Sequence, residues 1–210
     1  MEKMDKFYEK IHGSYMSFIG LVIFLIGLII AIIAEPNFSF FFHHISDLGA
    51  PTNSAYIIFD ICWFITGIFM IFFLIFFTRY LQEKGGAVKG TRIFLVLGII
   101  SALGILGLAV FNKIDSPTMH LASEYVFFFA GILYLLGFTI IEYRMPEFPK
   151  AQAILNLIVA YFFVEYLVIL ILDRVGPIIS PEVHSFTEWL FLFADLFWFF
   201  ENALYSLKVK

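Results

Sequence analysis

Charged residues are scarce in this chain of 210 residues, since Asp, Glu, Lys and Arg together make up only 14% of it. A typical soluble domain carries about 25%. The mean hydropathy is +0.94, and a soluble domain of this size could not bury so much apolar surface, because small domains leave much of their surface facing the solvent. The sequence therefore predicts an integral membrane protein.

Cysteine is nearly absent, and clustered basic residues are missing. The one cysteine, Cys62, lies inside an apolar run, so a disulfide scaffold is excluded and the redox compartment stays open. The net charge is −4, and no group of Lys and Arg is dense enough to hold a nucleic-acid backbone. We expect membrane lipids and no nucleic acid as partners, and the sequence identifies no protein partner.

Long apolar runs are what the sequence does contain. A spanning helix needs about 20 mostly apolar residues. Six stretches qualify, at about 14–34, 54–78, 93–111, 117–142, 151–172 and 181–207. The first exceeds the roughly 7–15 residues of a signal-peptide core, and no A-x-A cleavage site follows it. These runs predict an all-α, polytopic membrane protein with six transmembrane helices in a single transmembrane domain, residues 1–210.

The Lys and Arg residues predict how the chain crosses the membrane. The tails and the second and fourth loops hold 11 of them, and the odd-numbered loops hold only Lys113 and Arg174. Cytoplasmic loops carry the excess of Lys and Arg. We therefore predict a multi-pass protein of the cell membrane with both termini in the cytoplasm.

Most histidines and intramembrane acids fall on the other, non-cytoplasmic side. The histidines there are His43, His44, His120 and His184, and the acids in or near that half of the spans are Asp60, Glu124, Glu165, Glu188 and Asp195. An ionisable group inside a span costs several kcal/mol unless it faces a cavity or a partner. The grouping predicts a polar pocket open to the outside, although each acid alone fits equally well with a Tyr, Ser or Trp donor that holds it for packing.

An internal repeat supports this interpretation. The pattern S-P-x-x-H-x-x-[ST]-E occurs at 116–124 and again 64 residues later at 180–188, with a fainter copy at 52–60. Such a period predicts three tandem helical hairpins, and membrane proteins often form sites between parallel repeats. Ser116 and Ser180 suit the N-cap position, with proline at the first helical position.

The same pattern places a glutamate four residues after each histidine, on the same helix face. His120 with Glu124, and His184 with Glu188, suit three roles. The histidine is a metal ligand that donates a hydrogen bond to the carboxylate, a general base held in one tautomer, or part of a polar contact that joins two helices.

The first outer loop is about twice as long as the others and carries the run Ile45-Ser46-Asp47-Leu48-Gly49 before Asn53-Ser54. This run and the following span resemble the prokaryotic membrane family known as domain of unknown function 998. The resemblance covers roughly residues 14–206, and that family is similar to the Frag/DRAM/Sfk group, which includes DRAM autophagy modulators and a factor that remodels GPI-anchor lipids. It implies six helices, an outward-facing first loop and a link to membrane lipids, with no established reaction. The motif positions that carry over are Ser46, Asp47, Gly49 and His120.

A lipid hydrolase or acyl-transfer enzyme of the outer leaflet is the first functional hypothesis. Its catalytic candidates are His44, Asp47, His120, Glu124, His184 and Glu188. Zinc is the one candidate cofactor, with His44, Asp47, His120 and His184 as ligands, although no close-spaced zinc motif supports it. A metal-free version uses Ser46 or Ser116 as nucleophile. Other pocket candidates are His43, Ser46, Asp60, Glu165 and Asp195.

Two further hypotheses stay open. A non-enzymatic lipid-organising or regulatory protein would hold a headgroup in the pocket, and buried carboxylates suit a neutral or cationic one. A small transporter or proton pathway would use Asp195, Glu165 and Glu201, which step towards the inside. Against the latter, the charges cluster in one leaflet and no span shows a Gly/Pro break at mid-membrane.

Overall fold

The protein is described by a computed structural model that covers residues 2–176 and 178–209. Within these residues the secondary structure is entirely helical. The helices are α1 (Glu2–Lys10), α2 (Ser14–Ala34), α3 (Ile45–Leu48), α4 (Tyr56–Glu83), α5 (Val88–Val110), α6 (Pro117–Arg144), α7 (Lys150–Val175) and α8 (Pro181–Lys208). The predicted all-α fold is confirmed.

Six of these helices, α2 and α4 to α8, are long and apolar enough to cross a membrane. They coincide with the six predicted spans, and α2 has the predicted bounds. The largest differences lie at the ends facing the second loop, where α4 runs on to Glu83 and α5 begins at Val88, while the other bounds differ by up to three residues. Arg79 and Lys89 there are helical but charged, so a count of apolar residues leaves them out.

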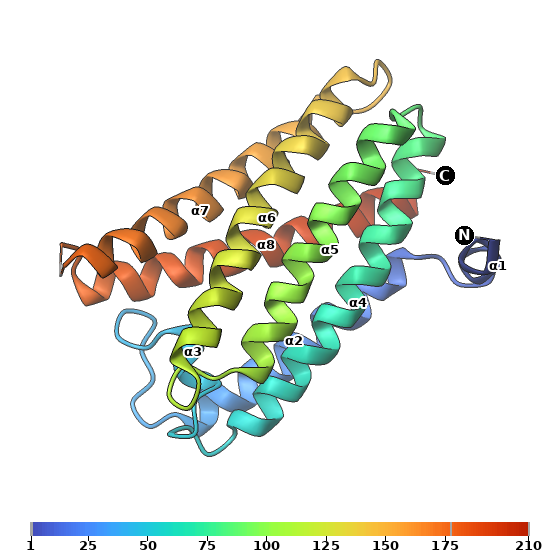
Figure 1. Cartoon of the computed structure of the whole chain (residues 1–210). Coiled ribbons are helices and arrows are strands. Elements are labelled where there is room, and N and C mark those ends of the chain that lie inside the picture. Colours follow the sequence, from blue (N-terminus) through green and yellow to red (C-terminus); the bar gives the residue numbers. More distant parts are fainter. Residues whose placement is uncertain (1, 177, 210) are drawn as a thin grey trace.

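Each long helix packs against the next along the chain, and α8 returns to α2 to close the bundle. Ser17 Oγ donates to the carbonyl of Phe199 at 2.9 Å, and Ser14 Oγ lies 2.9 Å from Ser206 Oγ. Figure 1 shows the termini and the α4–α5 and α6–α7 connections at one end of the bundle. We call this the terminal end, and the opposite end, with residues 35–55, 111–116 and 178–180, the loop end.

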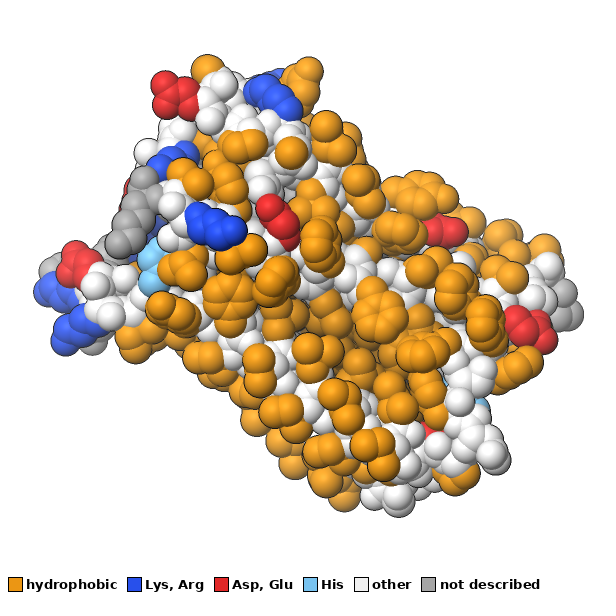
Figure 2. All heavy atoms as spheres, turned by 180° about the vertical axis from the view of Figure 1, so that it is seen from behind, with side chains coloured by type: hydrophobic (Ala, Val, Ile, Leu, Met, Phe, Trp, Pro, Cys, Tyr) orange, Lys and Arg blue, Asp and Glu red, His pale blue; other side chains and the backbone are white. Residues whose placement is uncertain are grey.

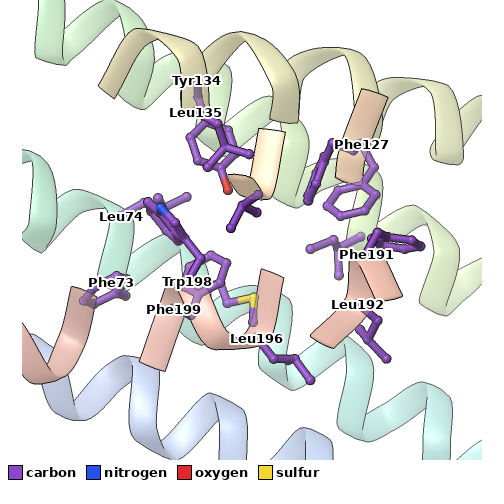
Figure 3. Packing of buried hydrophobic residues seen from close by; sticks show 14 of the residues in the cluster. Phe73, Leu74, Phe127, Tyr134, Leu135, Phe191, Leu192, Leu196, Trp198 and Phe199 are labelled. Carbon is purple, nitrogen blue, oxygen red and sulfur yellow. The ribbon is translucent and has the colours of Figure 1, made fainter. Parts of the chain in front are cut away.

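Aromatic rings fill the middle of the bundle. Figure 3 shows Trp198 of α8 among side chains of the surrounding helices, including Leu74 of α4 and Tyr134 of α6. Trp198 is fully buried, and the ring of Phe138 stacks parallel to it with centroids 6.4 Å apart. Because large side chains from several helices meet here, the two ends of the bundle are separated by a dense aromatic layer.

The outer surface is apolar across the middle. On the face in Figure 2 hydrophobic side chains cover the central band, while Lys and Arg gather towards the end that carries α1. Ile33, Ile61 and Phe197 are among the exposed large hydrophobic side chains of the chain. In water such a surface would aggregate, whereas in a bilayer it faces lipid.

Candidate functional site

The connection between α2 and α4 folds over the loop end of the bundle and is fixed there. Ile45 and Leu48 of α3 are fully buried. Asn53 Nδ2 donates to the carbonyl of Ala31 at 2.9 Å, and Trp189 Nε1 of α8 donates to the carbonyl of His43 at 2.9 Å. The ionisable side chains of this segment are therefore held in defined positions above the helices.

His44 stands at the start of α3 and joins this segment to α8. Its ring Nδ1 lies 2.6 Å from Glu188 Oε2, and its Nε2 lies 3.2 Å from Ser185 Oγ. Its backbone N–H donates to Asp47 Oδ2 at 2.7 Å, and Asp47 also forms an ion pair with Lys113. Burial by itself lowers the pKa of His44, but the hydrogen bond and charge of Glu188 outweigh it, so the pKa is raised above its usual value.

Two adjoining cavities lie beneath α3. The upper cavity has about 180 Å³ open to the centres of water molecules, and His44, Lys113, Arg174 and His184 are among its lining residues. The inner cavity has about 40 Å³, and Asp60 and Glu188 are among its lining residues. Both cavities are also lined by Ser46, His120, Glu124 and Tyr166. A water molecule needs about 10–15 Å³ by this measure, so the inner cavity has room for only a few.

His120 stands at the boundary of the two cavities with its ring orientation fixed. Nδ1 lies 2.6 Å from the carbonyl oxygen of Phe111, which can only accept a hydrogen bond. In a neutral ring the proton therefore sits on Nδ1 and the lone pair on Nε2. Glu124 Oε1 lies 3.7 Å from Nε2. This arrangement leaves a ring nitrogen able to accept a proton beside a carboxyl group.

His184 lies next to His44 in the upper cavity. The two rings meet edge to face with centroids 4.7 Å apart. His184 Nε2 is buried and has no hydrogen-bond partner among the described residues. The upper cavity thus combines histidine rings with the cationic side chains of Lys113 and Arg174 and with the carboxyl groups of Glu124 and Asp173.

The comparison with protein families agrees with the resemblance seen in the sequence. The model of the family described as "Protein of unknown function (DUF998)" matches residues 18–203. The chain belongs to this family. Nothing among curated proteins and nothing among solved structures matches it. For this DUF998 chain, the function therefore has to be argued from the site itself.

The structure brings together many of the candidates proposed from the sequence. His44, Ser46, His120, Glu124 and His184 line the upper cavity, and Asp60, Glu124 and Glu188 line the inner one. Asp47 lines neither, but its carboxylate pairs with Lys113, which lines the upper cavity.

Other candidates lie elsewhere in the DUF998 chain. His43 Nε2 is 3.6 Å from Glu35 Oε1 and stabilises the fold of the α2–α4 connection. Glu165 is half-buried on α7 and lines neither cavity. Asp195 is buried further down the bundle beside a cavity of about 10 Å³. Ser116, at the start of α6, also lines neither cavity.

The two copies of the repeat differ in their contacts. His120 faces Glu124 as the spacing predicts, but Glu188 contacts His44 rather than His184. Ser180 Oγ accepts from the N–H of Val183, whereas Ser116 occupies the N-cap position of α6 without a side-chain cap bond. The second copy is therefore tied to α3, and the first to the end of α5.

The proposed zinc ligands do not form a metal site in the described part of the chain. No three His, Cys, Asp or Glu side chains are grouped there so that they could hold a metal ion. The ring of His44 contacts Glu188 and Ser185. The carboxylate of Asp47 pairs with Lys113 and accepts a hydrogen bond from the backbone N–H of His44.

Ser185, Lys113 and Tyr166 belong to the site, but sequence reasoning missed them. Ser185 precedes Glu188 by three residues on α8, so both reach the same helix face and the same histidine ring. That spacing was a usable signal. In the sequence Lys113 stands out only as a cation of an outer loop, and Tyr166 has no feature that distinguishes it from the other tyrosines.

A second polar cluster lies near the terminal end, between α6, α7 and α8. Asn156 Nδ2 donates to Glu142 Oε2 at 2.8 Å, and Gln152 Nε2 donates to Glu201 Oε1 at 2.7 Å. The other carboxylate oxygens, Glu142 Oε1 and Glu201 Oε2, are buried without a hydrogen-bond partner among the described residues. Of these residues, the sequence had singled out only Glu201.

Proposed function

We propose that this DUF998 chain acts on lipids of the outer leaflet of the cell membrane. The Lys and Arg bias predicts that the terminal end lies in the cytoplasm, and in that orientation the loop end and its two cavities face outward. The lipid headgroup binds at these two cavities, and its acyl chains stay in the bilayer. The family resemblance, with its implied link to membrane lipids, agrees with this assignment.

The reaction we propose is hydrolysis, or acyl transfer, at an ester of that lipid by acid–base chemistry. The observation that carries it is His120, which lines both cavities and whose Nδ1 is held by the Phe111 carbonyl, so that Nε2 carries the lone pair. Nε2 takes a proton from a water molecule, or in acyl transfer from an acceptor hydroxyl, whose oxygen attacks the ester carbon. The departing alcohol oxygen then takes the proton back from the imidazolium.

Charge in the upper cavity supports this chemistry. The raised pKa of His44 favours its protonated form, and Lys113 and Arg174 line the same space. These cations stabilise negative charge that develops on the ester oxygen, in a cavity that the side chains of Glu124 and Asp173 also line. Ser185 is only 1% exposed and contacts the His44 ring, so it positions that histidine. Ser46 lines both cavities and is the nucleophile candidate for a covalent route.

The test is lipid turnover by the purified protein in nanodiscs of defined lipids, followed by mass spectrometry. Removal of a general base typically costs about 10²–10⁴-fold in rate, so His120→Gln should lose turnover by that factor. His43→Gln, which alters a histidine of the same loop end outside the cavities, is the matched control and should stay active. Lipid retained by the protein without turnover in the unmodified chain would favour the non-enzymatic lipid-binding alternative.

A small transporter or proton pathway is the second candidate. The observation that favours it is a set of buried carboxylate oxygens without described partners below the cavities, on Asp195, Glu142 and Glu201. These groups continue from the inner cavity towards the terminal end. Proton flux into proteoliposomes that disappears in Glu201→Gln would favour this function, and absence of flux in the unmodified chain would exclude it.

A further inference from the structure

Asp60 lies between the inner cavity and the surface that faces lipid. It lines the inner cavity together with His120 and Glu124. It also lines an open groove of about 290 Å³ between α4 and α5 on the outside of the bundle. One carboxyl group is therefore shared by the proposed reaction site and the membrane-facing surface.

The groove is apolar apart from Asp60. On α4 it is lined by residues spaced three or four apart along one face, Ile57, Ile61, Phe64 and Ile65, and on α5 by Ala109 and Val110. Ile57, Ile61 and Val110 each expose more than half of their surface. Further down, the two helices close on each other, since a Cβ on Gly67 would lie 2.7 Å from Leu106. The groove thus opens in the loop-end half only.

The Asp60 side chain is directed towards α3. A Cβ added to Gly49 would lie 2.6 Å from Asp60 Oδ1, so the carboxylate would have to turn away from its present position. No hydrogen bond or ion pair joins the Asp60 carboxylate to any other described residue. A half-buried carboxyl group in this state suits a ligand that supplies N–H or O–H donors.

The size of the inner cavity determines how a lipid reaches His120. About 40 Å³ holds a few waters and no acyl chain. A lipid whose ester is to meet His120 must therefore keep its chain outside the bundle, in contact with the bilayer. The α4–α5 groove supplies an apolar track of that kind, and Asp60 joins it to the inner cavity.

We propose that the groove is the lateral entrance for one outer-leaflet lipid, whose acyl chain lies along Ile57, Ile61 and Val110. Its headgroup donates a hydrogen bond from an amine or hydroxyl to Asp60. The lipid class is thus one with donor-bearing headgroups, such as phosphatidylethanolamine, in preference to phosphatidylcholine. This inference rests on the proposed function, because it names the substrate class and the route to the same site.

The test uses phosphatidylethanolamine and phosphatidylcholine probes, each with a diazirine on an acyl chain, photo-crosslinked to the full chain in nanodiscs. We expect crosslinks on peptides of α4 and α5, stronger for the ethanolamine lipid. Val110→Trp should fill the groove and remove them. Val168→Trp places the same side chain on a lipid-facing position of α7, 47% exposed in the unmodified chain and outside the groove, and should leave them unchanged. Asp60→Leu, which cannot accept a hydrogen bond, should abolish the preference for the ethanolamine lipid.

The outcomes separate the two proposals. Equal crosslinking in both tryptophan variants, or crosslinks spread evenly over all lipid-facing helices, would overturn the lateral entrance even if lipid turnover depends on His120. Groove crosslinks that Val110→Trp removes, in a protein without turnover, would support the entrance and overturn the reaction. Thermal unfolding of each variant verifies that the crosslinks report on folded protein.

Discussion

The ring of His44 joins the segment between α2 and α4 to α8. Two opposing influences govern the protonation of this ring. Burial disfavours the charged ring, while the carboxylate of Glu188 at 2.6 Å favours it. The carboxylate has the larger combined effect, so the pKa is raised. A group whose pKa is higher in the folded state stabilises the fold below its unfolded pKa, and this contribution is lost as pH rises through the folded pKa.

We predict that Glu188→Gln reverses the direction of the His44 pKa shift. Without the carboxylate charge, burial remains as the main influence, so the pKa should fall below its usual value instead of lying above it. NMR titration of ¹³C-labelled histidine in nanodiscs measures this directly. Glu182→Gln, an exposed change on the same helix, should leave the His44 titration as it was. A midpoint that does not respond to Glu188→Gln would contradict the assigned contact.

The same contact predicts a pH dependence of stability. The thermal unfolding temperature should fall as pH rises through the raised pKa of His44, because the protonated ring then loses its ion pair with Glu188. In His44→Gln this component should be absent. A stability curve with the same slope in both proteins would show that His44 is not its origin.

At the scale of helices, glycine sets how closely α5 and α6 approach. A Cβ on Gly104 would lie 2.6 Å from the backbone nitrogen of Phe127, so the neighbouring helix itself would have to move. A Cβ on Gly90 of the same helix would meet only the end of the Ile141 side chain, at 3.5 Å, which is an ordinary contact.

Gly104→Ala should therefore destabilise the protein by about 1–3 kcal/mol, as is typical of overpacking. Gly90→Ala should be neutral or mildly stabilising, because alanine is the better helix former by about 1 kcal/mol. Unfolding in a mild detergent, followed by circular dichroism, compares the two variants. Equal losses in both would mean that backbone flexibility, rather than close packing, explains the glycine at position 104.

The helices were predictable from the sequence because each apolar run is long enough to span a bilayer, and charge scarcity made the runs easy to delimit. Charge scarcity also identified His44, His120 and Glu188 as site candidates. The partner of Glu188 was not predictable. His184 lies four residues away on the same helix, yet the ring that Glu188 contacts belongs to His44, 144 positions away.

The reason is that the rotation of α8 about its own axis decides which side chains face the site. When both sides of a helix are apolar, the apolar pattern in the sequence does not predict that rotation. Phe197 is 54% exposed and Trp198 is fully buried, although both are large aromatic residues and neighbours in the chain. The groove beside Asp60 escaped prediction for a similar reason. The groove depends on how α4 and α5 diverge between Gly67 and the loop end. The spacing of residues within either helix carries no information about that divergence.

At the scale of the whole molecule, six spans require both termini on one side of the membrane, and the Lys and Arg bias predicts that this side is the cytoplasm. In a Cys62→Ser background, Asp115→Cys at the loop end should react with a membrane-impermeant maleimide in intact cells. Ala87→Cys at the terminal end should react only after the membrane is permeabilised. The opposite pattern would invert the orientation and move the proposed site to the inner leaflet.

The aromatic layer around Trp198 and Phe138 limits what becomes of a lipid that enters the loop end. A polar headgroup cannot move through such densely packed rings, so under the proposed function the reaction product would leave by the route that its substrate took. Lipid drawn from one leaflet would be returned to the same leaflet in altered form. Such a protein would make the two faces of a bilayer chemically different without transporting a single lipid across it.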